Sequence, residues 1–238
     1  MGKLWETTKN SLGFVAVCLG VVIALVLIAK ALEKLLPNPR RAKGARYIAL
    51  VAMFSAIGAV LMLLDIPLFF APGFYKLDLS ELPVLLCSFY LGPVAGVMSE
   101  FLKVFLKLLL KGSSTAFVGD FANFVVGASF VLPASFLYCA RRTAKAGWVG
   151  MAVGTLVMTV FGSVFNALYL IPRFASLYGM DLSAIVAMGT KVNSSITSLS
   201  TLVLYAVVPF NLLKGVCDSV LTALLYKRLE RVFFKENR

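Results

Sequence analysis

The 238-residue sequence contains no histidine and few charged residues, and both shortages narrow the kinds of protein that it encodes. Without histidine the chain lacks the most common metal ligand, the base of a Ser-His-Asp triad and an axial histidine for haem. Charged residues make up 14% of the chain and hydrophobic residues 60%, which is too apolar for a soluble domain of this size. We therefore expect a membrane protein without the usual histidine-dependent chemistry.

Missing motifs exclude further classes. Cys18, Cys87, Cys139 and Cys217 lie one per apolar segment without a CxxC pair, so the sequence predicts neither a disulfide framework nor a metal site. No GxxxxGK[ST] loop occurs, so the chain lacks the usual means of hydrolysing ATP. Its spans do not form two matching halves with paired broken helices, as those of stand-alone transporters often do. We therefore expect that the chain is not an enzyme and binds no cofactor. If its activity requires ATP, partner proteins must hydrolyse it.

Basic residues dominate the charged ones, with 23 lysines and arginines against 11 acidic residues and a net charge of +12. They gather at the ends of apolar stretches instead of alternating with aromatic residues on one polar face. This pattern favours contact with membrane lipid over nucleic acid.

Long apolar stretches predict membrane-spanning helices. A helix needs about 20 mostly apolar residues to cross a bilayer, whereas a β-barrel strand would show short alternating segments, which are missing here. We predict an all-α membrane protein with seven spans, at residues 12–36, 45–64, 82–98, 99–111, 116–139, 148–171 and 202–226. The first stretch continues into Pro37-Asn38-Pro39 and a basic segment, which favours a retained helix over a signal peptide. Arg173 to Thr201 is too polar to span, although Leu182 to Met188 fits a short helix at the interface.

Two segments depart from simple spans. Asp65 to Glu81 is rich in proline, aromatic and charged residues, so we expect a loop at the membrane surface or over a cavity. The stretch 99–111 carries Glu100 and three lysines spaced four apart, at Lys103, Lys107 and Lys111. Such a face must line a polar interior or extend to the headgroups, and the second alternative fits Lys111 best.

The second span has alanines on one helical stripe. Small side chains let another helix approach closely, and packing drives helix association in lipid. The partner helix belongs either to the same bundle or to a separate membrane protein. The stripe consists of Ala45, Ala49, Ala52, Ala56 and Ala59.

Polar residues within the last span mark a candidate binding face. Asn211 and Lys214 lie three residues apart on one helix face, just after Pro209, where we expect the helix to be interrupted. Their amide and ammonium groups suit a neutral ligand with several carbonyls and hydroxyls. The alternative is structural, with Lys214 paired to Asp218 four residues on.

Three further polar residues are more ambiguous. Asn166 fits a helix-to-helix hydrogen bond as well as it fits a ligand contact. Asp120 and Asn123 share a face, and we favour a structural role in which Asp120 pairs with Lys103 or Lys107.

The basic residues also predict an orientation. If the stretch 40–46 is cytoplasmic, alternation through seven spans places Arg141, Arg142, Lys145 and the C-terminus in the cytoplasm as well. The N-terminus then lies outside the cell. The loop after the second span and the polar segment before the last both face outward, where they reach one external cavity.

Several stretches, in this order, resemble one family. They are Phe74-Tyr75-Lys76-Leu77-Asp78-Leu79-Ser80-Glu81-Leu82-Pro83, Gly92-Pro93 with Gly96, Gly119-Asp120-Phe121-Ala122-Asn123-Phe124, and Pro209-Phe210-Asn211-Leu212-Leu213-Lys214-Gly215. Together they resemble the riboflavin-specific S component, the substrate-binding subunit, of bacterial energy-coupling factor (ECF) transporters. The resemblance covers about Arg46 to Arg231.

The resemblance implies a six-helix S-component core at residues 45–232, in a multi-pass protein of the bacterial cell membrane. Residues 1–44 add a further transmembrane helix and a basic cytoplasmic linker that the six-helix pattern lacks, and 233–238 form a cytoplasmic tail. The implied function is high-affinity capture of riboflavin outside the cell for an ATP-driven importer. Riboflavin is then the transported ligand, and the implied partners are a transmembrane coupling subunit and two ATP-binding cassette ATPases.

The resemblance also assigns residues. Riboflavin contacts carried over by motif are Lys76 and Asp78 in the outer loop, together with Asn166, Asn211 and Lys214. The family docks on its coupling subunit through an AxxxA patch, which Ala52 to Ala56 matches here. The alternatives are an S component for another vitamin, a membrane enzyme that uses Asp120, Glu100 and the lysine face on a phosphorylated lipid, and a structural subunit.

Overall fold

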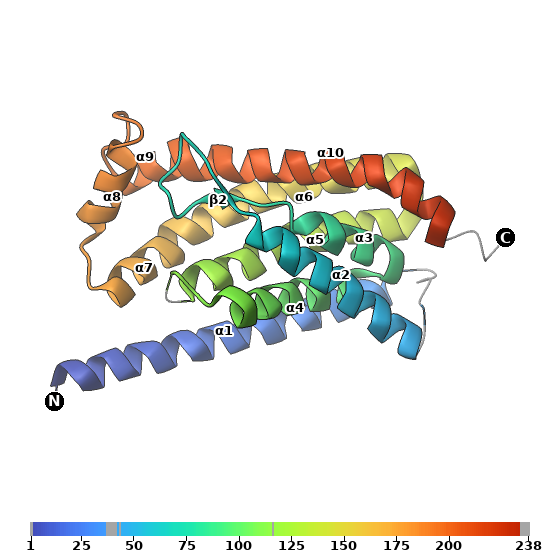
Figure 1. The fold of residues 1–238 in the computed structure, drawn as a ribbon, viewed down its shortest axis with the longest axis horizontal. Helices are drawn as coiled ribbons and strands as arrows, with labels where there is room; N and C mark the ends of the chain where they lie inside the picture. Colours follow the sequence, from blue (N-terminus) through green and yellow to red (C-terminus); the bar gives the residue numbers. More distant parts are fainter. Residues whose placement is uncertain (1, 37–41, 43, 116, 234–238) are drawn as a thin grey trace.

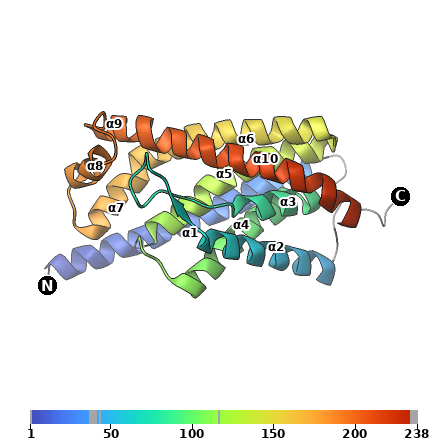
Figure 2. The same ribbon diagram turned by 45° about the horizontal axis from the view of Figure 1, so that its top comes forward.

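The computed structural model describes residues 2–36, 42, 44–115 and 117–233 (Figure 1). The predicted linker Pro37-Asn38-Pro39 and all but the first residue of the predicted tail 233–238 lie outside these ranges. The described residues form an elongated bundle of long helices that run along its length, as Figure 2 also shows from a second side. The helices are α1 (Gly2–Lys34), α2 (Ala45–Leu63), α3 (Glu81–Leu91), α4 (Pro93–Lys111), α5 (Val118–Arg141), α6 (Ala144–Phe165), α7 (Ile171–Tyr178), α8 (Leu182–Thr190), α9 (Leu199–Leu202) and α10 (Val208–Phe233).

Five of the described helical stretches are long and apolar enough to cross a membrane, at Gly13–Lys34, Ala45–Leu63, Val118–Arg141, Ala144–Tyr178 and Leu199–Tyr226. Many large hydrophobic side chains on them point outward, as expected where lipid is the solvent. The prediction of an all-α, multi-pass membrane protein is confirmed.

The predicted boundary between the third and fourth spans, near residue 98, is wrong, although the sequence does indicate a break at Gly92-Pro93 inside the third span. The chain turns at Gly92, between α3 and α4, and not near residue 98. Gly92 has a φ of 108°, a conformation that favours glycine, and Pro93 opens α4 with a φ already suited to a helix. The 92–93 pair therefore ends one helix and starts the next.

Helix α3 is too short to cross the bilayer alone. Its 11 residues extend about 16 Å at 1.5 Å per residue, about half of a hydrocarbon core. Figure 1 shows α3 beginning near the middle of the bundle, so the chain before it reaches inward without helical structure. That chain contains a short antiparallel ladder of β1 (Ile66–Pro67) and β2 (Lys76–Leu77), which the sequence did not predict. Irregular backbone at such depth is tolerated where it lines a cavity.

Two widened helical turns replace predicted breaks. Residues Asn166–Leu170 join α6 to α7, and Val203–Val207 join α9 to α10, each in a π-helical turn that ends two residues before a proline. The wider turn accommodates Pro172 and Pro209, whose rings would clash with a regular preceding turn. The predicted interruption at Pro209 is therefore wrong, and so is the predicted helix end at Ile171, because α7 continues to Tyr178. The predicted short helix is confirmed as α8, and its position at the membrane interface stays a prediction.

Helix α1 lies against the outside of the bundle. It contacts α4, α5 and α7 through Phe14, whose ring meets that of Phe121 edge to face at 5.7 Å, and through Ala29, which is fully buried. Only 6% of its most apolar window is buried, compared with 61% for α5. The remaining helices therefore enclose the interior, and α1 adds to one flank.

Candidate functional site

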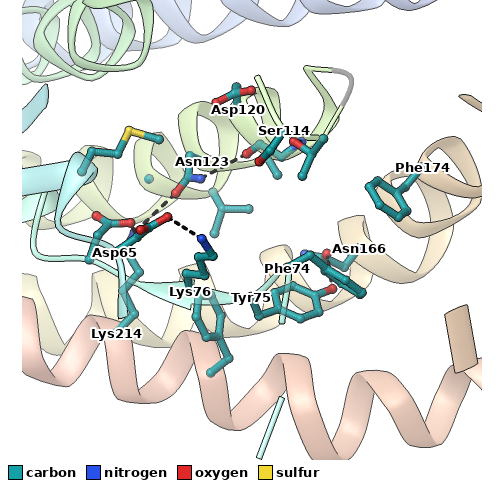
Figure 3. A pocket seen from close by; sticks show the side chains of 18 of the residues that line it. Asp65, Phe74, Tyr75, Lys76, Ser114, Asp120, Asn123, Asn166, Phe174 and Lys214 are labelled. Carbon is teal, nitrogen blue, oxygen red and sulfur yellow. Dashed lines mark hydrogen bonds and ion pairs between the residues drawn. The ribbon is translucent and has the colours of Figure 1, made fainter. Parts of the chain in front are cut away.

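A cavity of about 540 Å³ opens between the loop after α2, α4, α5, α6 and α10. All five residues that were predicted to bind substrate line it, namely Lys76, Asp78, Asn166, Asn211 and Lys214. They come from three separate parts of the chain, and Figure 3 shows several of their side chains around one space. The structure thus brings the predicted residues together, and their roles as ligand contacts stay predictions.

Lys214 is the central cation of the cavity floor. Its ammonium donates to Asp78 Oδ2 at 3.1 Å and to Asn123 Oδ1 at 3.4 Å, and it lies 3.3 Å from Glu81 Oε1. It is 4% exposed. The ion pair with Asp218 that the sequence left open is not formed, and both oxygens of Asp218 lack a hydrogen-bond partner among the described residues. Lys214 instead links α10 to the chain just before α3.

Asp78 anchors the loop that leads into α3. Its Oδ1 accepts hydrogen bonds from the backbone N–H and the hydroxyl of Ser80, while its Oδ2 accepts from Lys214. Asp78 and Ser80 are both buried, with 5% and 0% exposure. Because each carboxylate oxygen has a donor, Asp78 holds the inward-reaching loop at a fixed position relative to α10.

A second network of buried ion pairs adjoins the one around Lys214 and shares Glu81 with it. Lys103 Nζ lies 2.9 Å from Glu81 Oε2 and 2.6 Å from Glu100 Oε1, and all three side chains are essentially inaccessible. The interior position of Lys103 agrees with the predicted polar interior. Glu100 is enclosed here, so it is not available to a lipid headgroup, which removes one residue that the enzyme alternative required. Gly127 faces this network so closely that a Cβ there would lie 2.4 Å from a Glu100 oxygen.

Further ion pairs lie at the cavity rim. Lys107 lies 2.6 Å from Asp120 Oδ1, and the hydroxyl of Ser113 donates to Asp120 Oδ2 at 2.5 Å. Asp120 therefore pairs with Lys107 and not with Lys103, the other predicted candidate. Lys107 is only slightly exposed, at 13% of its side chain.

Asp65 forms the most exposed rim pair. Lys76 lies 2.9 Å from its Oδ2, and Lys111 lies 3.3 Å from its Oδ1. Partial burial raises the pKa of Asp65, but the hydrogen bonds from Lys76 and Lys111 outweigh it and hold the pKa below the ordinary value. Lys111 is 48% exposed, in agreement with its predicted position toward the headgroups.

Aromatic rings and amides form the upper wall. The hydroxyl of Tyr75 donates to Asn166 Oδ1 at 2.8 Å, and Asn166 Nδ2 donates to the carbonyl of Gly162 at 2.7 Å. Burial raises the pKa of Tyr75, so its hydroxyl stays a donor. The Tyr75 ring lies 5.3 Å from that of Phe210. Asn211 Nδ2 is buried without a partner among the described residues, which leaves a donor for a ligand.

Sequence reasoning missed several residues of this wall. Phe74, Tyr75 and Phe210 lie in the quoted motifs, but nothing in their spacing indicated that their rings face a cavity. Asn123 was assigned a structural role, yet its amide oxygen contacts Lys214 and its side chain lines the cavity. These residues could be found only by knowing that α5 and α10 both line one cavity, and no local sequence pattern shows this.

The cavity is suited to binding and offers little for catalysis. Planar aromatic walls, buried amides and neutralised charges favour an uncharged ligand with a flat ring and several polar groups. Among the described residues no cluster of three or more acidic or cysteine side chains is placed to hold a metal ion.

Most of the alanine stripe of α2 lies on the outer surface. Four of the alanines are exposed, whereas Ala59 is 1% exposed and packs inside the bundle. The opposite face of α2 bonds inward, because the hydroxyl of Ser55 donates to that of Ser99 on α4 at 3.1 Å. A smooth outer strip is thus available, and its use for docking stays a prediction. The exposed alanines are Ala45, Ala49, Ala52 and Ala56.

Comparison with known proteins identifies the family. The family model of the ECF transporter substrate-specific component matches residues 46–226. The chain is 35% identical to the riboflavin transporter RibU of Staphylococcus aureus, over 75% of this chain and 87% of that protein. It is 32% identical to the riboflavin transporter FmnP of Bacillus subtilis, over 77% and 91% of the two chains.

A solved structure agrees with the sequence comparison. The S component of a bacterial ECF transporter superposes with a TM-score of 0.62 at 35% identity, covering 79% of this chain and 96% of that one. The matched family residues begin after α1, so that helix lies outside the family model. The fold, the motifs and the relatives agree that this chain belongs to the substrate-specific components of ECF transporters.

Proposed function

We propose that this protein captures riboflavin with high affinity on the outer side of the membrane and delivers it into the cell, as the substrate-specific subunit of an ATP-driven importer. The single observation that carries the ligand assignment is the convergence of all five motif-assigned residues on one cavity. The named riboflavin transporters that are 31–35% identical to it over the aligned residues support it.

Riboflavin fits the chemistry of the cavity. The vitamin combines a flat aromatic ring system that carries carbonyls with an uncharged chain of hydroxyls. Phe74, Tyr75, Phe174 and Phe210 supply aromatic surface, and Asn211 supplies an amide donor without an internal partner. The cavity volume of about 540 Å³ lies within the range of roughly 300–1,000 Å³ that is usual for small-molecule sites.

The proposed orientation places the cavity outside. Figure 1 shows the beginning of α1 at the same end of the bundle as α8, and the C-terminus at the other end. Arg141 and Arg142 end α5 at the end opposite the cavity, which is the side that the excess of basic residues favours for the cytoplasm. The N-terminus is then outside the cell and the C-terminus is in the cytoplasm.

The proposed partners are a transmembrane coupling subunit and two ATP-binding cassette ATPases. The exposed alanines of α2 would admit close approach by a helix of the coupling subunit. Riboflavin is the cargo in this proposal, and no cofactor is required.

Purification from bacterial membranes tests the ligand. The protein should be yellow, absorb as a flavin and quench the fluorescence of added riboflavin. Colourless protein that binds no riboflavin at micromolar concentrations would contradict the proposal. Competition with other vitamins separates it from an S component of different specificity.

A further inference from the structure

Every lysine that lines the cavity is paired with a carboxylate of the same lining. Three lysines line it, Lys76, Lys107 and Lys214, and each lies within 2.6–3.3 Å of at least one carboxylate. Four carboxylates line the same space, Asp65, Asp78, Glu81 and Asp120, which is one more than the lysines. No arginine lines the cavity within the part of the chain that the structure describes.

A phosphate group would find no unpaired cation here. A phosphate monoester carries about −1.5 to −2 charges at neutral pH. Inside the cavity it would have to separate an existing ion pair or remain close to four carboxylates without a counter-charge. Both alternatives are unfavourable, because a buried charge needs a partner to offset its lost hydration.

Asp120 stands where a phosphate would otherwise be stabilised. It lies in the first turn of α5, a helix of 24 residues whose N-terminal end favours negative charge. Lys107 and the hydroxyl of Ser113 both bond to its carboxylate, while Ser114 and Thr115 line the cavity beside it. A lysine, hydroxyls and a helix N-terminus together form a usual phosphate-binding set, and Asp120 already occupies it with its own negative charge.

We propose that Asp120 is a specificity-determining residue, which makes the cavity select the unphosphorylated vitamin over its phosphate ester, flavin mononucleotide. The inference rests on the proposed riboflavin function and adds the discrimination to it. Its carboxylate neutralises Lys107 and the end of α5, so an incoming phosphate gains nothing from either.

The substitution Asp120→Asn tests this role. The amide keeps the size of the side chain and leaves Lys107 as a free charge-assisted donor. One such hydrogen bond corresponds to about a tenfold gain in affinity. Riboflavin and flavin mononucleotide are titrated separately into the purified full-length protein, and quenching of flavin fluorescence gives each Kd. The wild type should bind the phosphate ester at least about tenfold more weakly than riboflavin. The ratio of the Kd for flavin mononucleotide to the Kd for riboflavin should fall about tenfold in Asp120→Asn.

A matched control separates local from general charge effects. Asp181 precedes α8, is exposed and does not line the cavity, so Asp181→Asn makes the same charge change and should leave the ratio unaltered. Lys107→Gln leaves Asp120 without its counter-ion and should widen the ratio, which tests the inference even if Asp120→Asn does not fold.

The outcomes are distinct. Equal affinity of the wild type for both flavins, or an unchanged ratio in Asp120→Asn, overturns the role of Asp120 while riboflavin binding stands. A ratio that narrows or stays constant in Lys107→Gln overturns it as well. A wild-type protein that binds neither flavin overturns the proposed function and this inference together.

Discussion

Removal of the Lys214 ammonium should weaken riboflavin binding and destabilise the protein. In Lys214→Ala the buried carboxylates of Asp78 and Glu81 lose their shared partner, and only Lys103 remains nearby for Glu81. Breaking a buried pair by removing one partner costs about 3–5 kcal/mol. The loop that carries Lys76 and Asp78 also loses its link to α10, so we expect riboflavin affinity to fall by roughly 10- to 100-fold, as for one or two charge-assisted hydrogen bonds.

Two measurements on the same purified protein check this prediction. Quenching of riboflavin fluorescence gives the Kd, and thermal unfolding in detergent gives the change in stability without ligand. Lys191→Ala is the matched control, because Lys191 follows α8, is exposed and does not line the cavity. The control should retain both the affinity and the unfolding temperature of the wild type.

A double substitution separates the ion pair from general misfolding. If Lys214 acts mainly by neutralising Asp78, then Lys214→Ala combined with Asp78→Asn should cost less stability than the sum of the two single changes. A Lys214→Ala protein that binds riboflavin as tightly as the wild type and unfolds at the same temperature would refute the reasoning. Strictly additive losses would show that the 3.1 Å contact contributes nothing of its own.

Three further predictions concern docking, the extra helix and the turn at Gly92. Ala52→Leu should preserve riboflavin binding but abolish uptake in cells, because the larger side chain blocks close approach at the exposed strip of α2; equal loss of binding would indicate misfolding. Deletion of residues 1–44 should change the riboflavin Kd less than about twofold, because none of the α1 side chains that the structure describes lines the cavity, and a tenfold loss would contradict this. Gly92→Ala should lower stability by about 1–3 kcal/mol, because a φ of 108° is strained for any residue with a side chain. Gly73→Ala should not, because Gly73 lacks such a φ and has open space around it, and equal unfolding temperatures for the two variants would refute the strain.

Local sequence patterns predicted much of the candidate site. The spacing of Asn211 and Lys214 placed both on one helix face, and the polar loop after the second span indicated a cavity entrance. Helical spacing also suggested a pair between Lys214 and Asp218, because residues four apart on a helix are neighbours. The actual partner, Asp78, lies 136 residues away. Its choice depends on how far the inward-reaching loop extends before α3 begins, which helical periodicity does not specify.

The helix breaks near the prolines were likewise predicted only in part from the sequence. One span was predicted to end at Ile171, just before Pro172, and the last span to be interrupted at Pro209, but a proline alone does not determine whether a helix stops or widens. Here the π-helical turns Asn166–Leu170 and Val203–Val207 keep both helices continuous and bring Asn166 and the residues after Pro209 to the cavity. The two turns contact each other where α6 packs along α10.

The amino-acid sequence by itself determined the solvent, the helical class, the approximate spans and the residue types that a neutral polar ligand requires, because hydropathy and helical spacing are local properties. Tertiary structure alone decided which charges neutralise one another, which alanines of α2 face outward and which aromatic rings enclose the cavity. Those features depend on contacts between α3, α4, α5 and α10, and such contacts are set by the packing of whole helices.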